Sequence, residues 1–268
     1  MKKAVLSAAF ICLVHIVNAQ TNETCLSDFG LKGNVKEITD FVYRGYFNQD
    51  NVDSAKGPEK NIIKFDKNGN ELDAYSYDRR GRLSAKFVFS YENSKTLVKK
   101  SYDANGALQG EYIFKYDDKG NQIEMDTYYD IDLKLLNSLI YKYDKSGNRV
   151  EEDTYNAAGG LTEKAIYHFN ENGQVAEQNQ GWYMPNSSKI QKVLFKYDSA
   201  GNKTTDYTYD LNGQLTGESN ISYNNLDGHG NWQLKLTVLK GHTGWQGDFF
   251  FRNIVKRHIK YFLKVLPN

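Results

Sequence analysis

Apolar and polar residues alternate along most of the chain. Over residues 83–91, 112–116 and 161–169, most aromatic and aliphatic side chains fall on every second position. The places between them are mostly polar, with an occasional aliphatic residue such as Val88. A period of two places alternate residues on opposite faces of a β-strand, and no window shows a sustained period of 3.6. The pattern therefore predicts an all-β protein, with helix at most locally.

A short motif follows each predicted strand: an aromatic residue, Asp or a similar polar residue, two variable positions and a Gly. The stretch from Phe195 to Asn202 is a clear copy, with Asp198 after the aromatic residue and Gly201 near its end. Asp accepts hydrogen bonds from backbone N–H groups two residues on, and Gly supplies the positive φ that ends a type I turn with a bulge. The motif therefore predicts a tight turn. The first part of the motif, an aromatic residue followed by Asp, Asn or Glu, recurs at Phe65, Tyr77, Tyr91, Tyr102, Tyr116, Tyr129, Tyr143, Tyr155, Phe169, Tyr197, Tyr209 and Tyr223.

Shorter and longer spacings between these copies alternate, so the repeating unit is a pair of about 26 residues. Removing the turns leaves strands of about eight residues. We expect a long antiparallel β-hairpin meander of about a dozen or more strands. Sheets of this width twist and curl, so the predicted fold is a twisted, curled repeat sheet with Tyr and Phe on its inner face.

The two ends of the chain differ from the repeats. We expect a signal peptide over 1–19, an N-terminal tail and capping strand over 20–64, the repeat array over 65–232 and C-terminal capping strands over 233–268. Open sheet edges expose unpaired backbone groups, and atypical end units are the usual way to cover them.

The first residues have the pattern of a secretory signal. Lys2 and Lys3 precede a mostly apolar run, and small residues end at Ala19, which makes Gln20 the expected mature N-terminus. A lipoprotein is disfavoured because the residue before Cys12 is not small. No later run approaches the ~20 apolar residues that a spanning helix needs. We expect export to the periplasm, cell surface or medium, without stable membrane insertion.

Charge and cysteine content limit which kinds of partner the chain can bind and how it can be stabilised. Lys and Arg total 34 against 33 Asp and Glu, so nothing favours binding to nucleic acid or an anionic membrane. After processing, Cys25 is the single cysteine, which cannot close an intramolecular disulfide. Stability is therefore expected to come from packing of the 20 Tyr and 14 Phe in tightly turned strands.

The motif Tyr-Asp-x-x-Gly-Asn, alternating with a looser Tyr-Asp-x-x-Gly-x-Leu, resembles the repeat of the Rhs/YD-repeat superfamily. The clearest copies begin at Tyr116, Tyr143 and Tyr197, and the resemblance covers about 65–232. It implies β-hairpins stacked into a spiralling sheet, which in large members can enclose a toxin. The Asp-Pro-x-Gly self-cleavage signature of the large shells is absent, and the ending at Trp232 and after is similar to small secreted YD-repeat proteins of Gram-negative bacteria.

Residues with catalytic or metal-binding chemistry form no recognisable motif. His168, His229, His242 and His258 lack metal-ligand spacing, and no nucleophile motif is present. Each turn offers calcium one carboxylate and one amide, whereas calcium takes six to eight oxygens. In the acidic run 151–153, neighbouring residues point to opposite faces of a strand and make no facing pair. We expect neither an enzyme nor a metal or other cofactor.

Aromatic residues outside the repeat pattern are the candidate binding residues. Trp182 and Tyr183 interrupt the array, and Trp232 and Trp245 lie at or near loops. Trp and Tyr stack on sugar rings and anchor protein partners, although they also serve as core or edge-covering residues. The expected function is a non-enzymatic exported scaffold whose sheet surface binds a protein or a cell-envelope glycan. The alternatives are a carbohydrate-binding module, a glycan-acting enzyme, and a shell or carrier for a secreted effector.

Overall fold

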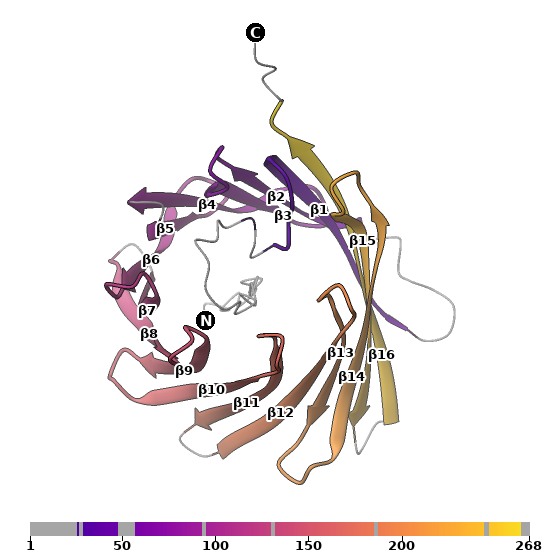
Figure 1. The fold of residues 1–268 in the computed structure, drawn as a ribbon. Helices are drawn as coiled ribbons and strands as arrows, with labels where there is room; N and C mark the ends of the chain where they lie inside the picture. The colour runs from indigo at the N-terminus through magenta and orange to yellow at the C-terminus, as the bar shows by residue number, and fades with distance from the viewer. Residues whose placement is uncertain are drawn as a thin grey trace, which may run out of the picture.

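A computed structural model describes residues 26, 29–47, 57–92, 95–129, 132–184, 187–243 and 247–263, which form sixteen strands (Figure 1). Residues 1–19, for which a signal peptide is expected, and the residues Cys25 and Trp245 lie outside the described ranges. No helix in the described part of the chain is long and apolar enough to span a membrane. The strands are β1 Val35–Phe47, β2 Glu59–Phe65, β3 Glu71–Tyr77, β4 Leu83–Glu92, β5 Lys95–Tyr102, β6 Leu108–Tyr116, β7 Gln122–Tyr129, β8 Lys134–Tyr143, β9 Arg149–Asn156, β10 Leu161–Phe169, β11 Val175–Met184, β12 Ser187–Tyr197, β13 Lys203–Tyr209, β14 Leu215–Leu226, β15 Trp232–Thr243 and β16 Gly247–Tyr261.

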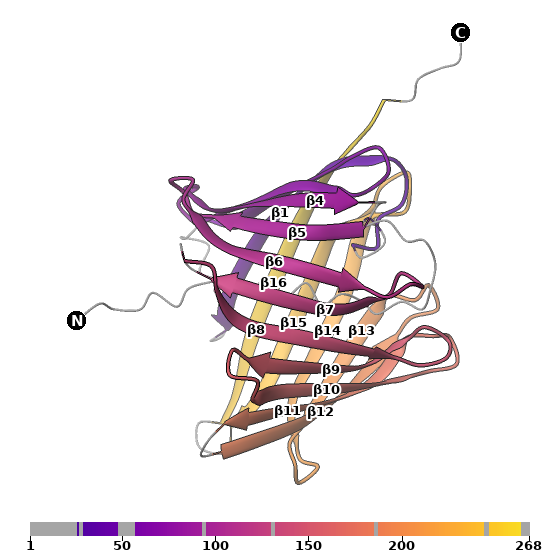
Figure 2. The ribbon, with the colours of Figure 1, turned by 90° about the vertical axis from the view of Figure 1, so that its left-hand side faces the viewer.

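The sheet closes into a barrel. Each strand pairs antiparallel with the next, and β1 pairs with β16 from Val35 opposite Tyr261 to Phe47 opposite Phe250 (Figures 1 and 2). The all-β antiparallel meander is confirmed. The twisted, curled repeat sheet expected from the sequence closes on itself, which the sequence pattern had left undecided. Successive strands rotate relative to one another, so the twist carries the first strand round to the last. Their pairing satisfies backbone groups that an open edge would leave free.

The alternating spacing of the motif reflects the two ends of the barrel. Turns that end in Asn, together with the turn over 170–174 that ends in Gln, lie at one end, called here the Asn-turn end: 66–70, 117–121, 144–148, 170–174, 198–202 and 227–231. Turns followed by Leu lie at the other, the Leu-turn end: 78–82, 103–107, 156–160 and 210–214. One repeat of about 26 residues is therefore one pass along the barrel and back.

The turn over 198–202 shows why the motif has these residues. The Asp198 Oδ1 atom accepts hydrogen bonds from the backbone N–H groups of Ala200 and Asn202, each at 2.9 Å. Gly201 has φ of 86°, a conformation that favours glycine. The Tyr197 hydroxyl donates to the Val175 carbonyl at 2.8 Å and so joins this hairpin to the preceding one. The Asp, Gly and Tyr of the motif thus fix the turn and the register between hairpins.

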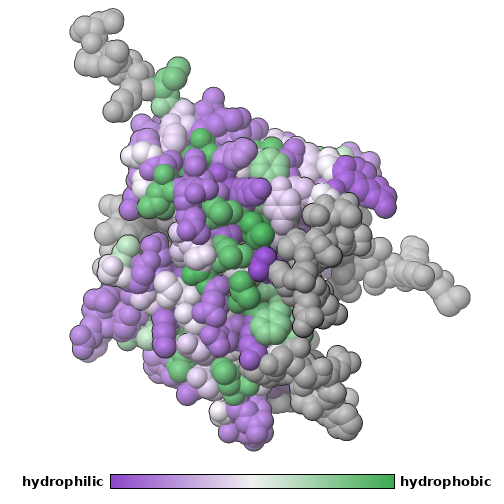
Figure 3. Space-filling model, turned by 90° about the vertical axis from the view of Figure 1, so that its right-hand side faces the viewer, coloured by the Kyte–Doolittle hydropathy of each residue, from purple (hydrophilic) through white to green (hydrophobic). Residues whose placement is uncertain are grey.

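The barrel has an aromatic inner wall. Its outer wall has ion pairs over part of the ring, and on the side that Figure 3 shows hydrophobic residues lie among the polar ones. Ile38, Ile63, Ala74 and Phe87 are successive cross-strand partners on the inner wall. The N-terminal segment over 29–34 lies inside the ring of strands (Figure 1). Residues from this segment and the inner wall form a buried cluster of Leu31, Val35, Ile38 and Phe65. The predicted placement of Tyr and Phe on the inner face agrees with this arrangement.

A side-chain amide attaches the N-terminal segment to the barrel. Asn231 is 2% exposed, and its Oδ1 accepts the Lys32 N–H at 2.7 Å while its Nδ2 donates to the Lys32 carbonyl at 2.9 Å. The same Nδ2 lies 2.8 Å from the Tyr261 hydroxyl, which also donates to the Asp227 carboxylate. The His229 ring stacks on Tyr261 with centroids 4.2 Å apart. Asn231 therefore pairs with residue 32 much as a peptide group does in a sheet.

On the outer wall, Glu151 and Asp153 lie between two lysines from the neighbouring strands. The Lys164 Nζ atom is 2.6 Å from Glu151 and 2.8 Å from Asp153, and Lys142 approaches both carboxylates from the other side. Hydrogen bonds from Lys142 and then Lys164 lower the pKa of Glu151 to about 2. The prediction that the acidic run 151–153 alternates between faces is confirmed, because Glu152 lies on the inner wall opposite Tyr141.

This cluster predicts acid sensitivity. Because the pKa of Glu151 is lowered in the folded state from 4.5, its contribution is present above pH 4.5 and disappears as the pH falls towards 2. Glu151→Gln should destabilise the protein by about 1 kcal/mol at pH 6, after solvent screening, and by almost nothing near pH 2. Urea unfolding at both pH values measures the difference. A Glu171→Gln control, at an exposed turn position, should change stability little at either pH, and a Glu151 effect independent of pH would contradict the prediction.

Candidate functional site on the inner wall

Inner-wall side chains of most strands remain partly accessible to solvent. A barrel of about 16 strands is too wide for its side chains to meet at the centre. Few hydrophobic residues of the described chain are deeply buried: Leu31, Val35, Ile38, Val42, Phe65, Tyr141, Ala165, Val193 and Ile221. Four of these form the cluster under the N-terminal segment. The walls away from that cluster can therefore contact a ligand.

Two rows of cross-strand partners cross the inner wall of β8–β12. One row runs through Tyr141, Glu152, Ala165, Gln180 and Gln191. The adjacent row runs through Leu139, Thr154, Glu163, Trp182 and Lys189. Residues that are far apart in sequence thereby share one surface. The inner-wall site is defined here as Glu152, Glu163, Gln178, Gln180 and Trp182.

Hydrogen bonds orient the polar side chains of the inner-wall site. Gln180 donates its amide N–H to the Glu163 carboxylate, and Gln178 donates to the Gln180 amide oxygen at 3.2 Å. Trp182 is the direct cross-strand partner of Glu163. A carboxylate, two amides and an indole therefore lie together, with spare donors on the amides and spare acceptors on the carboxylate.

Glu152 occupies a different electrostatic environment from Glu163. Burial raises the pKa of Glu152, the nearby Arg149 opposes that rise, and Glu163 adds to it. Arg149 lies 3.6 Å from the Glu152 carboxylate, and its guanidinium carbon is 4.1 Å from the centre of the Tyr141 ring. A carboxyl group that retains its proton more readily can donate a hydrogen bond as well as accept one.

The predicted site residues are dispersed rather than gathered. Trp182 lies on the inner wall, and the next residue, Tyr183, lies on the outer wall against Gly181 and is 38% exposed. Trp232 begins β15 at the Asn-turn end, where the Arg257 guanidinium carbon lies 3.9 Å from its ring centre. Trp245 lies outside the described residues. Only Trp182 belongs to the inner-wall site.

The three histidines whose side chains the structure describes lie apart from one another. His168 is exposed on the outer wall, and His258 contacts Phe41 with centroids 5.3 Å apart. His229 belongs to the contact around Tyr261. Within the described ranges, no group of three or more His, Cys, Asp or Glu residues is placed to hold a metal ion.

Sequence reasoning missed Glu152, Glu163, Gln178 and Gln180. A signal for Glu163 was available, because it shares the alternating face of Ala165 and Tyr167 in β10. A charged residue on an otherwise aromatic face departs from the pattern. The neighbours of Glu163 could not be identified, because cross-strand partners depend on the register of each hairpin.

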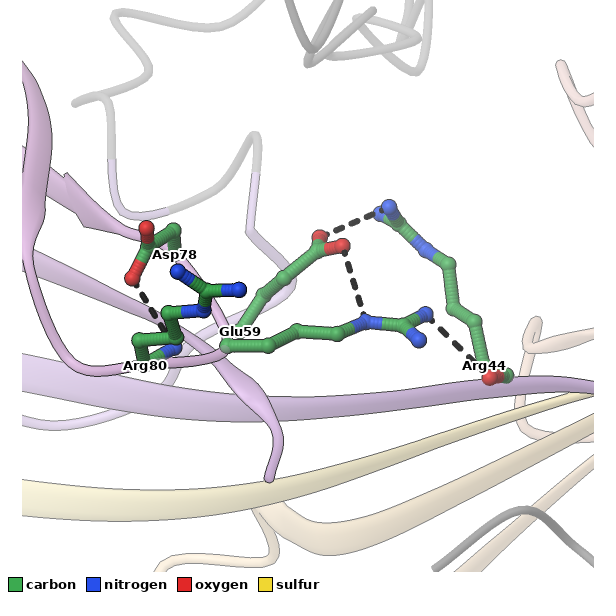
Figure 4. Close-up of polar contacts among 5 residues, drawn as sticks. Arg44, Glu59, Asp78 and Arg80 are labelled. Atoms are coloured by element: carbon green, nitrogen blue, oxygen red, sulfur yellow. Dashed lines mark hydrogen bonds and ion pairs between the residues drawn. The ribbon is translucent and has the colours of Figure 1, made fainter. Parts of the chain in front are cut away.

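A separate polar cluster lies at the Leu-turn end. Glu59 is contacted by Arg44 Nη1 at 2.8 Å and by Arg79 Nε at 3.6 Å, and Arg79 Nη2 donates to the Arg44 carbonyl at 3.3 Å (Figure 4). The Arg80 N–H donates to Asp78 Oδ1 at 2.9 Å. These contacts attach the turn between β3 and β4 to β1 and β2.

The comparisons give no family. No family model matches the chain, and no curated protein matches it. A porin-like protein from Bacteroides uniformis is similar with a TM-score of 0.48 and 10% identity over 84% of this chain and 96% of that one. A structure of TcdB2-TccC3 has a TM-score of 0.33 and 12% identity over 86% of this chain and 18% of that one. A LolA superfamily protein from Nitrosomonas europaea has a TM-score of 0.27 and 10% identity over 88% and 89%.

Proposed function

We propose that the protein is an exported, non-enzymatic β-barrel scaffold that binds an oligosaccharide of the cell envelope on its inner wall. The observation that carries the proposal is the hydrogen-bonded row of Glu163, Gln180 and Gln178 beside Trp182. Sugars present C–H faces that stack on aromatic rings and hydroxyl groups that both donate and accept hydrogen bonds. This wall offers both kinds of contact, which favours a glycan over a protein partner.

The other parts of the proposal have separate support. Export is supported by the leader-like pattern at 1–19. Membership of the YD-repeat superfamily is supported by the Tyr, Asp and Gly that recur in several turns, as in 116–120, 143–147 and 197–201. The outer-wall ion pairs around Glu151 and Asp153 favour a barrel that does not insert in a bilayer, since a charged side chain facing lipid near the midplane costs about 2–4 kcal/mol.

A glycan array with purified mature protein tests the proposal. Trp182→Ala should weaken binding of a retained glycan by about tenfold or more, because it removes an aromatic contact at the centre of the site. Tyr183→Ala is the matched control, since the two residues are adjacent on β11 but face opposite walls. The proposal is wrong if no envelope glycan is retained, or if the two variants bind equally well.

A glycan-acting enzyme is the second candidate. Glu152 and Glu163 face the inner wall from adjacent strands, and the pKa of Glu152 is raised by burial and by Glu163. Two carboxyl groups with different proton affinities are the reagents of most glycosidases. Product analysis of each retained glycan discriminates the two functions. If the wild type cleaves a retained glycan, and Glu152→Gln still binds that glycan but no longer cleaves it, the protein is an enzyme and the scaffold proposal is wrong.

A further inference from the structure

The inner wall of β13–β16 has one more cation than it has ion-paired carboxylates. Lys203 pairs with Asp206 at 3.0 Å, and Arg257 pairs with both oxygens of Asp40 at 2.8 and 2.7 Å. Lys235 lies on the same wall and has no carboxylate within ion-pair distance among the residues that the structure describes. One positive charge is therefore left without a partner.

The strand register places Lys235 close to Arg257, and Lys203 is near enough to repel it. Lys235 lies opposite Tyr223 on β14 and opposite Val255 on β16, and Arg257 is the next inward residue after Val255. The Lys235 Nζ atom is 5.6 Å from the centre of the Tyr223 ring. Burial lowers the pKa of Lys235, and repulsion from Lys203 and then Arg257 lowers it further, whereas the more weakly acting Asp40 and Asp206 carboxylates oppose the shift. Holding an unpaired ammonium in such a place is costly unless something compensates it.

We propose that Lys235, with Lys203 and Arg257 beside it, binds an oxyanion group of the ligand: a carboxylate, sulfate or phosphate. An oxyanion would supply the missing negative charge, and hydrogen bonds between ammonium or guanidinium groups and oxyanions are among the strongest in proteins. Burial raises the pKa of Tyr223 to about 12, so its hydroxyl keeps its proton at neutral pH and remains a hydrogen-bond donor. The carrier of the oxyanion is an acidic oligosaccharide; that part of the inference rests on the proposed function, whereas the oxyanion site itself does not.

Lys99, the other inner-wall lysine with a lowered pKa, has a different environment. Its Nζ atom lies 4.7, 5.7 and 5.0 Å from the ring centres of Phe87, Phe89 and Tyr112. Three aromatic faces compensate a cation by themselves. Lys235 has a single ring, 5.6 Å away, and two like charges nearby, so the aromatic contact alone does not compensate its charge.

Two titrations test the site with the full mature chain. Inorganic sulfate is added at constant ionic strength, and the lysine side-chain resonances are followed by NMR. Oligogalacturonate and its fully methyl-esterified, uncharged form are then compared by calorimetry. We expect sulfate to shift the Lys235 resonance saturably and the charged oligomer to bind about tenfold or more tightly than its ester.

Lys235→Met should remove the sulfate response and the preference for the charged oligomer, and Lys235→Arg should retain both. Lys86→Met is the matched control, because Lys86 lies on the outer wall, also without an ion pair in the described chain and 5.9 Å from the Tyr75 ring centre. Lys235→Met should also unfold at no lower urea concentration than the wild type, since it removes an uncompensated charge. If Lys235 instead stabilises the fold, Lys235→Met should unfold at a lower urea concentration than the wild type.

The outcomes separate the two proposals. Sulfate binding that depends on Lys235, without any glycan binding, would leave the oxyanion site standing and overturn the proposed function. Glycan binding that depends on Trp182, without any sulfate binding, would leave the proposed function standing and overturn the oxyanion site. Binding of sulfate and of the charged oligomer that Lys235→Met leaves unaltered, or an absence of sulfate binding, overturns the oxyanion site.

Discussion

Replacing Asn231 by leucine is expected to destabilise the protein by about 3 kcal/mol or more and to detach the N-terminal segment from the barrel. The substitution removes the amide that pairs with both backbone groups of Lys32 and contacts the Tyr261 hydroxyl. Each buried polar group left without a partner costs about 1–3 kcal/mol. Because Asn231 is 2% exposed, water cannot readily replace the lost contacts.

The repeat supplies its own control for this prediction. Asn202 occupies the same motif position, but it is exposed and its side chain bonds only to Asp198. Asn202→Leu should therefore cost about 1 kcal/mol or less. Urea unfolding gives the stabilities, and amide hydrogen exchange over 31–38 reports detachment. Equal losses in the two variants would show that Asn231 acts only as a turn residue.

Asp40→Leu is expected to cost about 3–5 kcal/mol, because it leaves the Arg257 guanidinium buried without its carboxylate. Asp40 and Arg257 face each other across the β1–β16 pairing that closes the barrel, and Arg257 is 6% exposed. The double variant Asp40→Leu/Arg257→Met should recover most of the loss. Replacing both partners of a buried ion pair with apolar residues is often neutral, whereas removing one is not.

A double-mutant cycle in urea measures this coupling. The outer-wall pair Lys64 and Asp73, 3.2 Å apart, is the reference, because Lys64 is 41% exposed. Asp73→Asn should cost about 1 kcal/mol or less. If Asp40→Leu lowers the free energy of unfolding no more than Asp73→Asn does, the ion pair between Asp40 and Arg257 is not important for stability. If the double variant is as unstable as the single one, the cost comes from packing rather than from an orphaned charge.

Local features of the fold could be predicted from the sequence because they depend on neighbouring residues. The turn chemistry of Asp198 and Gly201, and the alternation of faces around Phe87, are set within a few positions. Closure of the barrel depends instead on twist accumulated over sixteen strands and on pairing between residues such as Asp40 and Arg257, 217 positions apart. No local pattern contains that information.

The candidate site could be predicted only in part for the same reason. Trp182 was indicated by the break in the repeat. Its partner Glu163 lies on the previous strand, and the pairing of the two strands is shifted by a bulge between His168 and Phe169. The sequence does not show that bulge. The near-neutral net charge of the chain also gave no sign of which lysines form ion pairs. Lys164 on the outer wall lies beside two carboxylates, whereas Lys235 on the inner wall has no ion pair in the described part of the chain.

The two kinds of turn have a consequence for how such a barrel can evolve. Every pair-repeat leaves from the Asn-turn end and returns to it, so duplicating or deleting one adds or removes two strands while both rims keep their own turn chemistry. The first and last strands would still meet antiparallel, because the number of strands stays even. Gene duplication can therefore change the circumference of the barrel by two strands at a time. A relative with a wider or narrower barrel could arise without a new kind of turn and without a new pairing between the first and last strands.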